Sequence, residues 1–170
     1  MDVSGLAWNY VDLLVIFLPA MVANGAPVIF KGKTPLDGGK KFIDGKRVFG
    51  DGKTVEGFLI GVLAGLIIGL FEALVTFNNN FLYIGLLGGL GAMLGDVAGS
   101  FLKRRMGYER GEPLLFADQL DFALCTTLFY YLSGVEMNLY ALLLIYLTIF
   151  VLHIGTNRIA YNLKLKDVPY

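Results

Sequence analysis

The sequence predicts an all-α integral membrane protein with five transmembrane helices, its N-terminus outside and its C-terminus cytoplasmic. The first observation behind this prediction is the composition: hydrophobic residues make up 56% and charged residues 16% of the 170-residue chain, and the mean hydropathy is +0.65. Soluble globular domains carry about 25% charged residues. This composition therefore excludes an ordinary soluble domain.

The second observation is a series of apolar segments of membrane-spanning length. A bilayer core of about 30 Å takes about 20 residues of helix. Five segments meet this length: Leu6–Phe30, Val55–Phe77, Phe81–Leu102, Leu114–Leu132 and Leu139–Asn157. The ten residues at the start of the chain carry no Lys or Arg, so we expect the first segment to be a retained anchor and no signal peptide.

The third observation is the placement of the basic residues. All 14 Lys and Arg lie in Lys31–Lys53, Lys103–Arg110 and Arg158–Lys166. The connections 78–80 and 133–138 contain none. With five spans the three basic regions share one side of the membrane, and the positive-inside rule makes that side cytoplasmic.

Glycine spacing indicates how the helices pack. One ribbon of small residues recurs every four positions from Gly57 to Gly69, and a second recurs from Gly91 to Gly99. Such ribbons let helix backbones approach closely in a membrane. They could act within one subunit or between two, which leaves a homodimer open.

Carboxylates near the ends of two predicted helices mark a candidate site. Asp96, Ser100 and Lys103 share one helix face, and Asp118 and Asp121 share another. A charge in a membrane segment is costly, so its default interpretation is functional. Two helix ends would point carboxylates toward one another beneath a basic loop, as a metal-dependent phosphate site requires.

Other polar residues in the apolar segments permit weaker interpretations. Asn24 and Pro27 are predicted to interrupt the first helix and free carbonyl groups toward a cavity. Glu72 is expected to snorkel to the membrane boundary. We expect His153 to be an interhelical hydrogen-bond partner and not a metal ligand. A lone Cys125 excludes an intramolecular disulfide.

The first basic connection, Lys31–Thr54, is rich in glycine as well as in cations. Glycines let backbone N–H groups approach phosphate oxygens, and the cations neutralise them. A polyphosphate-binding loop and a loop that only follows the membrane surface both remain open. The two Gly-Lys-Thr triplets are not P-loops, because Pro27 and Arg47 stand where the motif needs glycine.

Three motifs of the chain resemble the signature of the membrane cytidylyltransferases that make CDP-diacylglycerol. They are G-D-x-x-x-S-x-x-K-R at Gly95–Arg104, D-x-x-D at Asp118–Asp121 and K-T-x-E-G at Lys53–Gly57. The pattern from Lys31 to Thr54 is similar to the first loop of the archaeal branch, the CDP-archaeol synthases. Gln119 departs from the bacterial D-R-x-D motif, and between Met106 and Ala117 only Pro113 stands for the bacterial pattern; both departures fit the archaeal branch.

The resemblance implies one transmembrane domain over residues 1–170, with cytoplasmic loops at about 31–54 and 103–113. It implies transfer of CMP from CTP to an isoprenoid ether-lipid phosphate, 2,3-bis-O-geranylgeranyl-sn-glycerol 1-phosphate, at the cytoplasmic face of the cell membrane. The expected partners are CTP, this lipid phosphate and the bilayer, with Mg²⁺ as cofactor and no nucleic acid.

The same resemblance assigns residues to roles. Asp96, Asp118 and Lys103 are the expected catalytic residues, and Asp96, Asp118 and Asp121 the expected Mg²⁺ ligands. The expected substrate-binding residues are Asn24, Lys31, Lys33, Asp37, Lys40, Arg47, Gly50, Asp51, Gly52, Lys53, Thr54, Ser100, Arg104 and Gln119.

Two other classes of membrane protein share some of these features. A transporter or flippase for an anionic lipid or nucleotide would also carry broken spans and buried carboxylates, but it would usually show an internal repeat, which this chain lacks. A CDP-alcohol phosphatidyltransferase needs Ala-Arg after its Asp-Gly pair, and the glycines after Asp37 do not lead into one.

Overall fold

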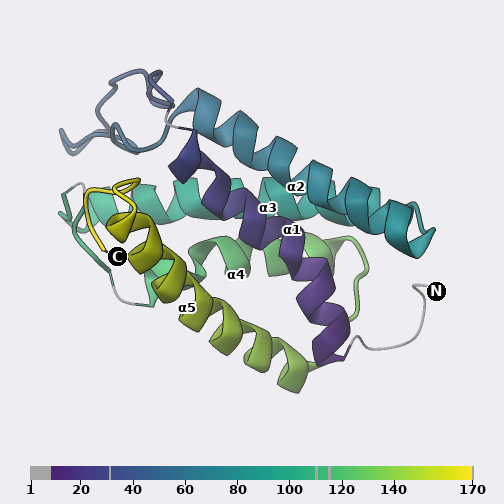
Figure 1. The fold of residues 1–170 in the computed structure, drawn as a ribbon. Helices are drawn as coiled ribbons and strands as arrows, with labels where there is room; N and C mark the ends of the chain where they lie inside the picture. Colours follow the sequence, from purple (N-terminus) through teal and green to yellow (C-terminus); the bar gives the residue numbers. More distant parts are fainter. Residues whose placement is uncertain (1–8, 31, 110, 115, 170) are drawn as a thin grey trace.

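The structure, a computed structural model, describes residues 9–30, 32–109, 111–114 and 116–169. These residues form an all-helical fold, which confirms the predicted class (Figure 1). The described part of the chain contains α1 (Tyr10–Ile29), α2 (Val55–Thr76), α3 (Asn80–Arg105), α4 (Ala117–Leu132) and α5 (Leu139–Asn162).

Four of these helices are long and apolar enough to cross a membrane: α1, α2, α3 and α5. The fourth expected segment, 114–132, is helical only from Ala117. Its 16 residues span about 24 Å, because a helix rises about 1.5 Å per residue. The Asp118 carboxylate accepts the Leu114 N–H at 2.9 Å, and Phe116 has a φ of +67°. The chain before α4 is thus tied to the candidate site and does not extend the helix.

α1 is continuous, so the predicted interruption at Asn24 and Pro27 is wrong. The helix runs through Pro19 and Pro27 and ends at Ile29, two residues after the second proline. A proline inside a helix removes the one hydrogen bond that its own N–H would donate to the carbonyl four residues earlier, and α1 continues past this loss at both positions. Asn24 therefore reaches the site from a regular helix.

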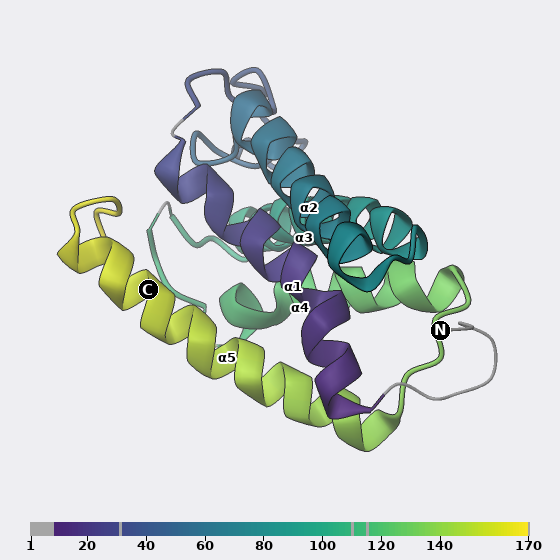
Figure 2. The ribbon, with the colours of Figure 1, turned by 45° about the vertical axis from the view of Figure 1, so that its right-hand side comes forward.

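The described residues of the basic connections gather at one end of the bundle, which we call the basic end: residues 32–54, 103–109, 111–114 and 158–169. It lies at the left of Figure 1, whereas the connections α2–α3 and α4–α5 lie at the opposite end. α3 packs extensively against both α2 and α4, and α1 crosses α2 and α3. α5 packs less extensively, against α1 and α4, and is the most peripheral helix (Figure 2).

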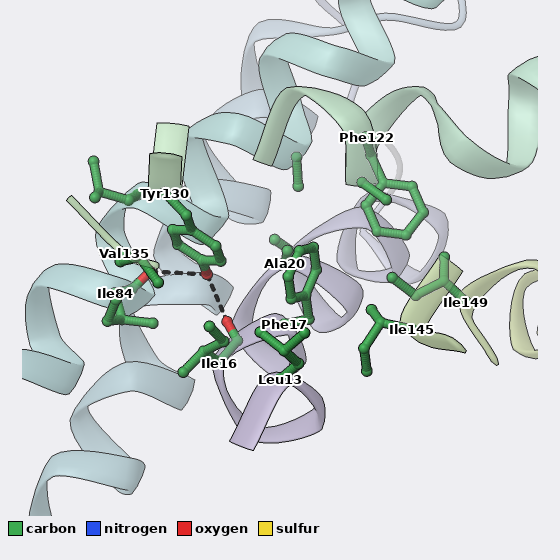
Figure 3. Close-up of a cluster of buried hydrophobic side chains, with 14 of the residues drawn as sticks. Leu13, Ile16, Phe17, Ala20, Ile84, Phe122, Tyr130, Val135, Ile145 and Ile149 are labelled. Atoms are coloured by element: carbon green, nitrogen blue, oxygen red, sulfur yellow. Dashed lines mark hydrogen bonds between the residues drawn. The ribbon is translucent and has the colours of Figure 1, made fainter. Parts of the chain in front are cut away.

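The apolar core surrounds the N-terminal half of α1. Leu13, Ile16 and Phe17 of α1 are fully buried, together with Ile145 of α5. The Tyr130 hydroxyl of α4 donates to the Ile16 carbonyl at 2.6 Å and also lies 3.3 Å from the Ile84 carbonyl (Figure 3). This buried contact joins α4 to α1 and α3.

The two predicted glycine ribbons pack within the chain. A Cβ at Gly65 would lie 2.7 Å from Gly89 Cα, and one at Gly69 would lie 2.6 Å from Gly85 Cα, so α2 and α3 meet backbone to backbone. In the second ribbon, a Cβ at Gly95 would lie 2.5 Å from the Asp121 carbonyl oxygen. This ribbon sets the distance between α3 and α4, the two helices that carry the carboxylates.

Glu72 does not snorkel, because α2 turns it into the bundle. The residue is 5% exposed, and neither carboxylate oxygen has a hydrogen-bond partner among the residues that the structure describes. The sequence-based interpretation was therefore wrong: the ribbon that faces α3 also fixes which way Glu72 points.

Replacing this carboxylate should stabilise the protein. A buried polar group without a partner costs several kcal/mol, and methionine has a similar volume without the polar atoms. We expect Glu72→Met to raise Tm by roughly 2–4 °C for each kcal/mol recovered. Thermal unfolding in detergent measures this, with the exposed Glu136→Met as control; a lower Tm for Glu72→Met would show that the carboxylate has a structural partner.

Candidate active site

A cavity of about 870 Å³ opens at the basic end, and each of the five helices contributes to its wall. The polar residues lining it include Asn24 of α1, Asp96 and Ser100 of α3, and Asp118 and Asp121 of α4. The predicted convergence of carboxylates from two helix ends is therefore present in the described structure.

Lys53 and Asp96 form the first ion pair of this cavity. The Lys53 ammonium donates to both Asp96 carboxylate oxygens at 2.7 Å, and the two side chains are 24% and 30% exposed. Lys53 is placed by the start of α2, where the Thr54 hydroxyl accepts the Gly57 N–H at 3.1 Å and caps the helix. The first loop thus delivers a cation to a carboxylate of α3.

Lys103 and Asp118 form the second ion pair. Their charged atoms lie 2.7 Å apart, and Lys103 also donates to the Glu112 carbonyl. Lys103 is on the last turn of α3, where a cation stabilises the helix end. All four side chains of these pairs are partly exposed and border the cavity. A bound anion could therefore compete with the carboxylate for either lysine.

Asp121 lies deeper than these pairs. One of its carboxylate oxygens accepts a hydrogen bond from the Phe122 backbone N–H at 2.6 Å. The other oxygen lies against the backbone of Gly99, where an added Cβ would overlap it. Asp121 is also close enough to Asp96 and Asp118 to interact with them electrostatically.

The three carboxylates fit a magnesium site by their chemistry, since Mg²⁺ prefers hard oxygen ligands. Within the described residues, no three carboxylate, imidazole or thiol groups yet stand close enough to hold an ion together. Two of the three carboxylates, those of Asp96 and Asp118, are paired with lysines. An ion at this site would therefore have to displace Lys53 and Lys103.

The loop before α2 is organised around a buried carboxylate. The side chain of Asp37 is 1% exposed; it pairs with Arg47 at 2.6 Å and accepts the N–H groups of Phe49 and Gly50 at 3.0 Å. Burial alone would raise its pKa, but Arg47 and these N–H groups hold the pKa of Asp37 well below its ordinary value of 3.8. Asp37 thus shapes the glycine-rich turn that lines the cavity.

The charge of Asp37 should therefore stabilise the loop at all physiological pH values. Because its folded pKa is depressed, its contribution is present above about pH 4 and is lost only as the pH falls through the folded value. We expect Asp37→Asn to increase tryptic cleavage of the loop at neutral pH. Asp44→Asn, which removes a more exposed ion pair to Arg105, serves as control, and equal cleavage of the two variants would contradict this role.

Several predicted substrate-binding residues line the cavity, and others do not. The cavity wall includes Asn24, Gly50, Asp51, Gly52, Lys53, Thr54, Ser100 and Arg104. Arg47 lies behind the turn, Lys33 is exposed, and Lys40 lines a separate, shallower pocket. Gln119 is 3% exposed and points into the bundle. Lys31 lies outside the described residues.

The structure adds polar residues that the sequence had not assigned to the site, three of them at the end of α5 and in the chain after it. His153, Asn157 and Lys166 border the same cavity from α5 and the chain after it. Lys166 had been counted only as a basic residue of the C-terminal region. The i, i+4 spacing of His153 and Asn157 was the one available signal for a shared helix face.

Comparisons with known proteins agree with one another. A family model described as CDP-archaeol synthase (CarS-like) matches residues 9–170. The chain is 48% identical to a CDP-archaeol synthase of Methanopyrus kandleri over 92% of its own length and 91% of the relative's. It is 45% identical to a CDP-archaeol synthase of Sulfurisphaera tokodaii, over 92% and 94% of the two chains.

A solved structure is also similar. It is described as an intramembrane enzyme for archaeal membrane lipid biosynthesis, and it matches with a TM-score of 0.83 and 39% identity. The match covers 88% of the present chain and 94% of the other.

Proposed function

The chain belongs to the CDP-archaeol synthase family and acts as a cytidylyltransferase in archaeal lipid synthesis; we propose that the Lys53–Asp96 and Lys103–Asp118 pairs form its catalytic centre. In this reaction the phosphate of 2,3-bis-O-geranylgeranyl-sn-glycerol 1-phosphate attacks the α-phosphorus of CTP. A bond forms between an oxygen of the lipid phosphate and the α-phosphorus, the bond between the α-phosphorus and the oxygen bridging to the β-phosphorus breaks, and pyrophosphate leaves with the bonding electrons.

The observation that carries this proposal is the pairing of two lysines with two carboxylates in one cavity. A triphosphate entering this cavity offers acceptors with more charge than a carboxylate has. Lys53 and Lys103 would move to phosphate oxygens, since ammonium groups are strong phosphate donors. Their departure would leave Asp96 and Asp118 as free acceptors.

These carboxylates, with Asp121, would hold Mg²⁺. A bound divalent ion neutralises phosphate oxygens and the charge that develops on the leaving pyrophosphate. Because Asp121 sits deeper than the other two, it would fix the inner side of the site. Ser100, one turn along α3 from Asp96, could donate a hydrogen bond to a phosphate oxygen.

The reaction needs no strong general base. A phosphomonoester has its second pKa near about 6 and is largely dianionic at neutral pH. The obstacle is the approach of one anion to another. Lys53, Lys103 and Arg104 lower that barrier by neutralising charge, while the turn from Gly50 to Gly52 brings backbone groups close to the nucleotide.

The activity is tested with purified protein, radiolabelled CTP, Mg²⁺ and the lipid phosphate. We expect pyrophosphate and a labelled CDP-lipid in equal amounts, and neither product when the lipid is omitted. A carrier, the alternative that the sequence left open, finds no support in the relatives reported above. Transport of label into vesicles without pyrophosphate release would contradict the enzyme.

We further propose that the basic end faces the cytoplasm and that α4, together with the segment before it, completes a fifth crossing in the cell membrane. The positive-inside rule supports this orientation, because every described Lys and Arg belongs to the basic end. The short α4 would start inside the bilayer, where non-helical backbone is tolerated if it lines a polar cavity.

Single cysteines test this orientation. In a Cys125→Ala background, Lys40→Cys and Lys164→Cys should react with a membrane-impermeant maleimide only after the cells are opened. Both positions are exposed, so a failure to react cannot be due to burial. Labelling of either cysteine in intact cells would contradict the orientation.

A further inference from the structure

The first loop is attached to the end of α3 by Arg105, the last residue of that helix. One guanidinium nitrogen donates to the Asp44 carboxylate at 3.0 Å, and another donates to the Arg47 carbonyl. The central carbon of the guanidinium lies 4.8 Å from the centre of the Phe42 ring and 4.9 Å from that of the Phe101 ring. Arg105 therefore contacts the loop through a carboxylate, a backbone carbonyl and an aromatic ring.

Aromatic rings extend this contact between the loop and α3. Phe101 lies one turn before Arg105, and its ring meets that of Phe42 edge to face, with 5.4 Å between the ring centres. The Phe49 ring lies 6.4 Å from the same ring of Phe101. A cation attracts an aromatic face more strongly when it is shielded from water, and the Arg105 side chain is only 18% exposed. The contact is thus a packed one and not a loose surface pair.

Arg105 lies outside the active-site cavity, in contrast to its neighbour Arg104. In the part of the chain that the structure describes, the cavity wall includes Arg104 but not Arg105 or Phe101. The two arginines follow one another at the end of α3, so a regular helix points them in different directions. Arg105 is therefore placed to act on the loop and not to touch a substrate.

A chain of contacts leads from Arg105 to the cavity wall. Arg105 holds the Arg47 carbonyl, and the Arg47 side chain pairs with Asp37 at 2.6 Å. Asp37 in turn accepts the Gly50 N–H at 3.0 Å. Gly50 begins the turn that lines the cavity and leads into Lys53. The contact at Arg105 thus helps to set where this turn lies relative to α3.

Among the described residues, two ion pairs tie the first loop to α3. One joins Lys53 to Asp96, and the other joins Asp44 to Arg105. The two α3 residues are about 14 Å apart along the helix, at about 1.5 Å per residue. The proposed reaction moves Lys53 from Asp96 to a phosphate oxygen, which removes the first attachment. The contacts of Arg105 involve no residue that changes partner in this step, so they would keep the loop over the cavity.

We propose that Arg105 is a positioning residue for nucleotide binding: it holds the first loop on α3 so that the Gly50–Gly52 turn and Lys53 stay over the cavity. This inference rests on the proposed function. A lysine in its place would keep the positive charge but lose the planar group that meets a ring and a carbonyl at once. The loop uses the shape of the guanidinium, and not its charge alone.

Arg105→Lys tests this proposal with the charge retained. We expect the KM for CTP to rise roughly tenfold, the scale of one lost hydrogen bond from a charged group, while the KM for the lipid phosphate changes less than twofold. Without substrates, trypsin should cleave the segment 32–54 faster, with cleavage elsewhere unchanged. Asp44→Asn is the matched control: its ion pair with Arg105 is partly exposed and contributes little, so the KM for CTP should stay the same.

Two further variants separate shape from charge. Phe42→Leu removes the ring on the loop without changing any charge; Phe42 is 41% exposed, so the core stays intact, and the KM for CTP should again rise. Arg105→Gln should behave like Arg105→Lys. Parent values for Arg105→Lys beside an impaired Arg105→Gln would overturn the proposal, because charge alone would then suffice.

Two other results would also overturn it: an unchanged KM for CTP in both Arg105→Lys and Phe42→Leu, or an equal rise in the KM values for CTP and lipid phosphate. Absence of pyrophosphate release from the unmodified protein would instead refute the proposed function. The rates of tryptic cleavage would in that case still show whether Arg105 holds the loop, because they require no activity.

Discussion

Asp96→Asn is expected to lower turnover by about 10²-fold or more while leaving the protein folded. Asparagine keeps the shape of the side chain but removes the charge that would hold Mg²⁺. The scale follows from losing several kcal/mol of charge stabilisation at about 1.4 kcal/mol per decade. The Mg²⁺ concentration at half-maximal activity should also rise, because one ligand is missing.

Thermal unfolding of the same variant separates catalysis from stability. The Lys53–Asp96 pair is partly exposed, and such pairs contribute about 0–1 kcal/mol, so the change in Tm should be small. Asp44→Asn, with the same charge change outside the cavity, should keep its activity. Normal turnover in Asp96→Asn at an unchanged Mg²⁺ midpoint would refute the assignment of Asp96.

Gly95→Ala is expected to damage both the fold and the activity. An added Cβ would lie 2.5 Å from the Asp121 carbonyl oxygen, so α4 would have to move away from α3. Overpacking of this kind typically costs about 1–3 kcal/mol of stability. A displacement of about 1 Å between Asp96 and the α4 carboxylates can lower turnover about 10²-fold.

Gly155→Ala provides the matched control for this substitution. Gly155 is also a helical glycine, but a Cβ there would meet no atom within 4 Å. Alanine favours helix over glycine by about 1 kcal/mol, so this variant should be as stable as the parent or more so. Equal Tm and turnover in the two variants would show that the α3–α4 approach is not critical.

Much of the site could be predicted because helical periodicity is strictly local. The spacing of Asp96, Ser100 and Lys103 places them on one face of α3, and all three line the cavity in the structure. The basic segments likewise gather at one end because helices of similar length return the chain alternately to either end. The order of the three motifs along the chain indicated the family, and the comparisons confirm it.

Other features depend on contacts between distant segments and could not be predicted. The ion pair between Lys53 and Asp96 joins positions 43 residues apart. Before α4, the Asp118 carboxylate accepts a hydrogen bond from the Leu114 N–H, and the helix begins only at Ala117. Hydropathy does not report this contact, so the predicted segment was too long. The predicted position of Glu72 at the membrane boundary was wrong because its burial depends on which face of α2 meets α3.

The most direct test of the catalytic centre is the turnover of the double variant Asp96→Asn/Asp118→Asn beside the two single variants, at saturating CTP and lipid phosphate. Ligands of one metal act as a unit, so removing the second should matter little after the first is lost. We predict a double variant scarcely slower than the slower single variant. Losses that multiply, so that the double variant falls by the product of the two single effects, would contradict a shared site.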